Sequence, residues 1–145
     1  MGRRQSLCKI ELDLSFRENI LLEPNIESIG RFMKEIPMFD VVVMQEEEIL
    51  AEKVRAIMAR TRARDVYDLA FLLDRNTEID FKLIEEKLAY YNKKWDYTEF
   101  IENLNNSGHI WKTELEALIP NLLDFNLTKN RILRIFREKS SLQEH

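Results

Sequence analysis

The hydrophobic pattern changes at Gln45, and this change limits the possible fold more than any other feature of the chain. Residues 9–17 alternate between polar and apolar side chains, which predicts a half-buried strand whose apolar face carries Ile10, Leu12, Leu14 and Phe16. From Gln45 onward apolar residues recur about every 3.6 residues, the period of an α-helix. The sequence therefore predicts an α+β fold, with a small sheet at the amino end and a mostly helical body.

Turn residues and apolar spacing predict the other elements. Residues 18–37 contain two prolines and a glycine, so we expect a loop, a short helix over residues 26–36 and a second loop. The valine-rich residues 39–44 predict a second, more buried strand. The expected helices of the body cover residues 46–60 and 63–73, a segment after the amino cap Asp80, residues 98–104 and 110–119, and a last segment from Thr128.

Length and composition point to one domain, with a strand-containing part over about residues 9–44 and a helical body over about residues 45–139. The chain has 145 residues, of which 45% are apolar and 33% charged, which is too apolar for a disordered chain. No apolar run approaches the roughly 20 residues of a membrane helix, so we expect no membrane span. One cysteine and two histidines exclude a disulfide framework and a Cys/His zinc site, and they fit a cytoplasmic protein.

Glycine spacing and net charge exclude two further classes. The three glycines are far apart, so neither a Walker loop nor a Gly-x-Gly-x-x-Gly turn is present. A general nucleic-acid binder would have a surface that is basic throughout, and a net charge of −4 argues against such a surface. Aromatic and lysine residues interleave over residues 90–112, where helical spacing favours a core over a base-stacking surface.

Lys53 is the most informative charged residue. It is four residues from both Ile49 and Ile57, so it lies beside the apolar stripe of its helix. A turn near residues 60–62 would fold the next helix back and bring Asp65 within hydrogen-bond reach of Lys53. The pair is open to two interpretations: an ion pair that joins two helices, or a lysine that faces a phosphate and is oriented by the aspartate. Spacing alone does not choose between them.

Two more groups of charged residues accompany this pair. Arg60, Arg62 and Arg64 cluster at the same turn and are either solvated or part of the same site. Glu11 and Asp13 share the polar face of the first predicted strand and could direct two carboxylates at a cation such as Mg²⁺, or simply face water.

The spacing of the charged residues resembles a known family signature. Residues 47–57, Arg60 and residues 63–69 are similar to the Glu-x-x-Ala-Glu-Lys-x-x-Ala … Arg-Asp-x-x-Asp-Leu signature of AbiEii/AbiGii-type nucleotidyltransferase toxins. Residues 9–18 resemble the strand that precedes it. Trp111-x-x-Glu114-Leu115 and residues 123–125 resemble the carboxy-terminal helical part, so the likeness covers nearly the whole chain.

This resemblance implies a fold, an activity and a site. The family has a nucleotidyltransferase fold related to polymerase β, and many members are toxins of type IV toxin–antitoxin systems. Some transfer a nucleotide from a nucleoside triphosphate to an acceptor, including transfer RNA ends. By position, Asp13 matches a catalytic carboxylate near the Mg²⁺ ions, Lys53 the catalytic lysine that contacts nucleotide phosphate, and Asp65 the catalytic aspartate that supports it. Arg60 and Arg64 would line the same nucleotide-binding pocket.

One family motif has no counterpart in this sequence. The Gly-Ser-x-x-x-Asp-x-Asp segment, which holds the metal-bound triphosphate, is not found. We therefore expect a truncated relative that is inactive alone, with a sheet that is a remnant of the family fold. Its expected partners are a nucleoside triphosphate, an RNA acceptor, an antitoxin or the missing amino-terminal half, and a second copy of itself. The alternative is a non-catalytic helical module that binds a partner protein, such as an antitoxin.

Overall fold

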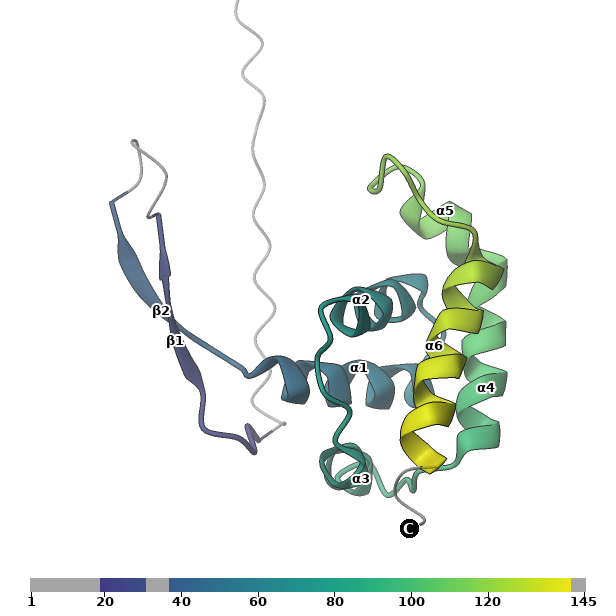
Figure 1. Cartoon of the computed structure of the whole chain (residues 1–145), viewed down its shortest axis with the longest axis horizontal. Helices are drawn as coiled ribbons and strands as arrows, with labels where there is room; N and C mark the ends of the chain where they lie inside the picture. Colours follow the sequence, from purple (N-terminus) through teal and green to yellow (C-terminus); the bar gives the residue numbers. More distant parts are fainter. Residues whose placement is uncertain (1–18, 31–36, 142–145) are drawn as a thin grey trace, which may run out of the picture.

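The computed structural model describes residues 19–30 and 37–141. Two antiparallel strands, β1 (Asn25–Ile29) and β2 (Phe39–Val43), precede a series of helices, which confirms the α+β class. The first predicted strand, over residues 9–17 with Glu11 and Asp13, lies outside the described residues. In Figure 1 the hairpin stands beyond the amino-terminal end of the first helix, on the side away from α4 and α6.

The hairpin differs from the sequence prediction in two ways. Residues 26–29 belong to a strand, so the prediction of a helix from residue 26 is wrong there. Ile26 pairs with Val42 across the hairpin. This pairing overrides the weak helical spacing of the segment. The second strand is also less buried than expected, because no other described element packs on it. Val42 is 72% exposed and Phe39 47% exposed.

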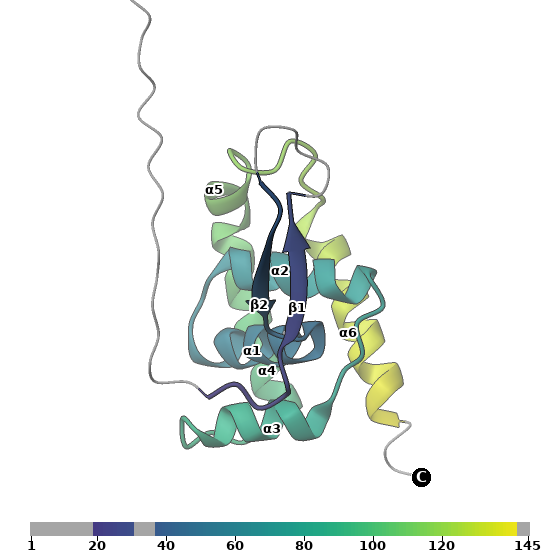
Figure 2. The same ribbon diagram turned by 90° about the vertical axis from the view of Figure 1, so that its left-hand side faces the viewer.

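The helical body follows the predicted order. Its helices are α1 (Glu46–Ala59), α2 (Ala63–Asp74), α3 (Phe81–Ala89), α4 (Tyr97–Asn106), α5 (Trp111–Leu115) and α6 (Phe125–Ser141), with a 3₁₀ turn at Ser107–Ile110. Helix α3 is capped as expected, because the Asp80 carboxylate accepts a hydrogen bond of 3.1 Å from the Leu83 amide. Figures 1 and 2 show α1 between α2 and α3, with α4 and α6 across its far end.

Two boundaries in the carboxy-terminal half were predicted wrongly. Helix α5 ends at Leu115 and not near residue 119. Helix α6 begins at Phe125 and not at Thr128, because the Asp124 carboxylate accepts a hydrogen bond of 2.9 Å from the Asn126 amide and caps the first turn. Thr128 lies inside the helix, where its hydroxyl donates to the Asp124 carbonyl oxygen at 3.1 Å.

The core lies among α1, α2, α3, α4 and α6. Leu50, Val54 and Leu69 are fully buried, and the rings of Phe100 and Phe136 pack with their centroids 4.9 Å apart. Trp111 is also buried, and Trp95 and Tyr97 pack against the core, whereas Tyr90 and Tyr91 are exposed. Within the described ranges, no helix is both long and apolar enough to cross a membrane.

A buried ion cluster ties the segment before the hairpin to the helices. Glu48 is fully buried and accepts hydrogen bonds from the Leu21 and Leu22 amides at 2.8 and 2.9 Å. Lys87, which is 5% exposed, lies 2.6 Å from Glu48 and 3.0 Å from Glu52. Because every charge in the cluster has a partner, the cluster holds α1, α3 and residues 19–22 together.

Candidate functional site

The predicted approach of Lys53 and Asp65 is present in the structure. Helix α1 ends at Ala59 and α2 begins at Ala63, so the short turn between them brings the two helices side by side. The Lys53 ammonium lies 3.4 Å from an Asp65 oxygen and 2.6 Å from an Asp68 oxygen. Lys53 is therefore held between two carboxylates one turn apart on α2, and the closer one is Asp68.

Asp65 joins this lysine to the arginine of the turn. Arg60 donates from Nε to Asp65 Oδ2 at 2.9 Å and from Nη2 to Oδ1 at 3.3 Å. The Asp65 side chain is only 3% exposed, whereas the Arg60 side chain is 61% exposed. The buried carboxylate thus fixes the positions of two cations that face outward.

Glu114 is a site residue whose contacts the sequence spacing did not reveal. Its carboxylate accepts a hydrogen bond of 2.9 Å from the Ala63 amide and one of 3.2 Å from Arg62. Helix α2 has no side-chain cap from its own N-cap residue Arg62, so Glu114 supplies the cap from α5. These contacts cross 51 or more residues, and no local pattern signals them.

Together these side chains line one open groove. Its lining residues are Lys53, Arg60, Arg62, Arg64, Asp65, Asp68 and Glu114. Two cations, Arg60 and Arg64, were expected near Lys53. Both line the same groove as Lys53. The lining carries four cations and three carboxylates, a formal charge of +1. An ammonium and several guanidinium groups around one opening suit an anion with several oxygens, such as a polyphosphate, which would compete with the carboxylates for them.

The described carboxylates do not form a metal site. No group of three metal-binding side chains is close together within residues 19–30 and 37–141. Asp65 and Asp68 are both engaged by cations of the groove, so they do not fit Mg²⁺ in this arrangement. Asp13, the expected metal ligand, lies outside the described residues.

The fold and the groove define a class of protein. It is an α+β protein whose helical body carries a groove, lined by lysine, aspartate and arginine, at the turn between its first two helices. The family model described as nucleotidyl transferase AbiEii toxin, type IV TA system, matches residues 3–139. The chain therefore belongs to the AbiEii nucleotidyltransferase toxin family. No curated protein and no solved structure matches it.

Loss of the Glu114 carboxylate should destabilise α2. We expect Glu114→Ala to lower the free energy of unfolding by about 1 kcal/mol, the usual effect of losing an amino-terminal cap. Urea unfolding followed by circular dichroism measures this change. Glu116→Ala is the matched control, because Glu116 is exposed on the adjacent turn. Equal stability of the two variants would show that Glu114 is not a cap.

Proposed function

We propose that the groove binds the polyphosphate of a nucleoside triphosphate. The observation that carries the proposal is the position of Asp65, a buried carboxylate that directs both Lys53 and Arg60 toward one opening. Lys53 would contact phosphate oxygens, and Arg60 and Arg64 would add hydrogen bonds from the rim of the groove. Asp65 would act by positioning these cations. Membership of a nucleotidyltransferase family supports this assignment.

The reaction class proposed for the complete site is nucleotidyl transfer. An acceptor hydroxyl, for example on an RNA end, attacks the α-phosphorus; the nucleoside monophosphate stays on the acceptor and pyrophosphate leaves. A divalent cation, for which Mg²⁺ is the natural choice, would neutralise the phosphate oxygens during this step. We assign Asp13 as one of its ligands from family resemblance. The described groove supplies the phosphate contacts and their positioning.

We further propose that these 145 residues bind the triphosphate but do not transfer it by themselves. No Gly-Ser-x-x-x-Asp-x-Asp segment is present in the sequence. Transfer would require a polypeptide segment that carries this motif. The test incubates the purified chain with Mg²⁺, each labelled nucleoside triphosphate and RNA, and measures incorporation. We expect background levels, and robust incorporation into RNA or protein would contradict this part of the proposal.

Family membership also suggests a partner and a cellular compartment. Type IV toxin–antitoxin membership leads us to propose an antitoxin as a partner of this chain in the cytoplasm.

A non-catalytic interaction module is the second candidate, and the hairpin is the observation that favours it. Ile26, Val42 and Met38 are 71%, 72% and 67% exposed. A two-stranded hairpin with uncovered apolar side chains is typical of a surface that pairs with another chain. In this candidate function, the Lys53–Asp65 pair would only join two helices.

The hairpin predicts self-association. We expect the mass measured by light scattering to increase with protein concentration, because pairing would cover the apolar side chains of the hairpin. Val42→Lys should reduce this increase, whereas Tyr90→Lys should not, since Tyr90 is an exposed residue (54%) that lies outside the hairpin, just after α3. A constant monomer mass for the unmodified chain would contradict the prediction.

A further inference from the structure

Each of the three carboxylates that line the groove is paired with at least one of its cations. The pairs are Lys53–Asp65, Lys53–Asp68, Arg60–Asp65 and Arg62–Glu114. A phosphate oxygen that binds one of these cations must displace a carboxylate or share the cation with it. Ligand binding therefore depends on which carboxylate can leave its cation at the lowest cost.

Two of the three carboxylates are held firmly. The Asp65 side chain is 3% exposed and accepts two hydrogen bonds from Arg60 in addition to its contact with Lys53. Glu114, whose side chain is 19% exposed, also accepts from the Ala63 amide and caps α2. Displacing Asp65 would leave a buried charge without its partners, and displacing Glu114 would leave the end of a helix uncapped. We therefore expect both to stay in place when a ligand binds.

Asp68 is held by a single ion pair. Among residues 19–30 and 37–141, its ion-pair partner is Lys53, at a distance of 2.6 Å. The Asp68 side chain is 45% exposed, so water can solvate the carboxylate once it leaves the lysine. An exposed ion pair of this kind contributes little to stability. Asp68 is therefore the carboxylate that a ligand can displace at the lowest cost.

Asp68 lies on the solvent side of the Lys53 ammonium. Asp65 and Asp68 are three residues apart on α2 and approach this ammonium at 3.4 and 2.6 Å. Asp65 is closed to water whereas Asp68 is not, so a phosphate that approaches from the groove meets Asp68 first. The carboxylate and the phosphate are both negatively charged and repel each other at short range. Asp68 thus occupies the lysine on the side where a phosphate would bind.

We propose that Asp68 is an internal competitor of the ligand. Its carboxylate pairs with Lys53 in the unbound groove and moves into water when a polyphosphate binds. This inference rests on the proposed triphosphate site. Asp65 and Asp68 then have opposite effects on the same lysine, because Asp65 holds it in position and Asp68 weakens its binding to phosphate. The affinity of the groove for polyphosphate is therefore lower than its cations alone would give.

The experiment measures the Kd of inorganic tripolyphosphate by calorimetric titration. Asp68→Asn should lower this Kd by about two- to fivefold, the effect of removing one exposed ion pair that competes with the ligand. Asp68→Glu keeps the charge and should leave the Kd close to that of the unmodified chain.

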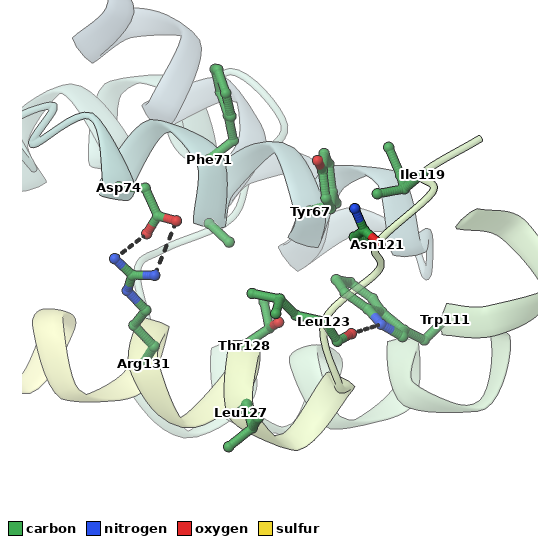
Figure 3. Close-up of a pocket in the computed structure, with 11 residues that line it drawn as sticks. Tyr67, Phe71, Asp74, Trp111, Ile119, Asn121, Leu123, Leu127, Thr128 and Arg131 are labelled. Atoms are coloured by element: carbon green, nitrogen blue, oxygen red, sulfur yellow. Dashed lines mark hydrogen bonds and ion pairs between the residues drawn. The ribbon is translucent and has the colours of Figure 1, made fainter. Parts of the chain in front are cut away.

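Asp74→Asn is the matched control for the change of charge. Asp74 lies on the same helix, its side chain is 40% exposed, and it pairs with Arg131 at 2.7 Å. It lines a separate pocket between α2 and α6 (Figure 3). The substitution should leave the Kd of tripolyphosphate unchanged, and circular dichroism should show that each variant is folded.

A second comparison tests whether Asp68 acts through Lys53. In a chain that already carries Lys53→Met, Asp68→Asn should no longer lower the Kd, because the ammonium for which the carboxylate competes is gone. An equal gain with and without Lys53 would show that Asp68 acts only as a general charge, and would overturn the proposal.

The titrations also separate failure of this inference from failure of the triphosphate site. If the unmodified chain binds tripolyphosphate and Asp68→Asn binds it equally well or more weakly, Asp68 is not a competitor and the triphosphate site stands. If neither protein binds tripolyphosphate, both proposals are overturned.

Discussion

Replacing Lys87 by methionine is expected to lower the free energy of unfolding by about 3–5 kcal/mol. The substitution leaves Glu48 fully buried without the ammonium that lies 2.6 Å from it. It also removes the hydrogen bond of 2.9 Å that Lys87 donates to the Asn19 carbonyl oxygen. Because a domain of this size is stable by only about 5–15 kcal/mol, urea unfolding should show a large shift of the midpoint.

Two further variants separate the charge effect from packing. Glu48→Gln combined with Lys87→Met should be more stable than Lys87→Met alone, because it leaves no uncompensated buried charge. Its amide oxygen can accept from only one of the Leu21 and Leu22 amides, so part of the loss should remain. Lys82→Met, on the exposed face of α3, should leave stability nearly unchanged. If Lys87→Met unfolds at the same urea concentration as the unmodified chain, the cluster contributes no net stability.

The same cluster makes stability depend on pH. Burial alone would raise the pKa of Glu48, but hydrogen bonds from Lys87 and from the Leu21 and Leu22 amides outweigh burial and hold this pKa below its usual 4.5. A carboxyl whose pKa is lowered by folding stabilises the fold above its unfolded pKa. This contribution is therefore present above about pH 4.5 and is lost as the pH falls below it.

The loss of stability at low pH can be measured directly. We expect the free energy of unfolding of the unmodified chain to fall as the pH is lowered below 4.5, with part of this fall absent in Glu48→Gln. Urea titrations of both proteins at several pH values measure the difference. Parallel pH profiles would show that Glu48 does not carry this dependence.

Lys53→Met is expected to lower triphosphate affinity by roughly tenfold to a hundredfold, the effect of losing a hydrogen bond to a charged group. Stability should change little. The Lys53 side chain is 26% exposed, its closer partner Asp68 is 45% exposed and can be solvated, and Asp65 keeps both hydrogen bonds from Arg60. Calorimetric titration with a nucleoside triphosphate and thermal unfolding measure the two properties.

Lys82→Met is again the matched control, since it removes a lysine from outside the groove. It should leave triphosphate affinity unchanged. Unaltered affinity in Lys53→Met would show that Lys53 only joins α1 to α2, as in the interaction-module alternative.

The sequence predicted those features that depend on local spacing. The change of period at Gln45 indicated where the helical body begins, and the positions of Lys53 and Asp65 on two helices joined by a short turn predicted their approach. The strand over residues 26–29 was missed because its partner β2, and not its own spacing, determines its structure. Lys87 with Glu48, and Glu114 with Ala63, are 39 and 51 residues apart, so their pairing depends on tertiary packing.

The central claim is that the groove binds the phosphates of a nucleoside triphosphate, and titration of the unmodified chain tests it most directly. Each of the four ribonucleoside triphosphates is titrated with Mg²⁺, alone and in competition with inorganic tripolyphosphate, and nucleoside monophosphates are titrated in parallel. We predict saturable triphosphate binding that tripolyphosphate displaces and salt weakens, with a Kd at least about tenfold lower than that of the monophosphate. No saturable binding of any triphosphate, or binding that tripolyphosphate does not displace, would contradict the claim.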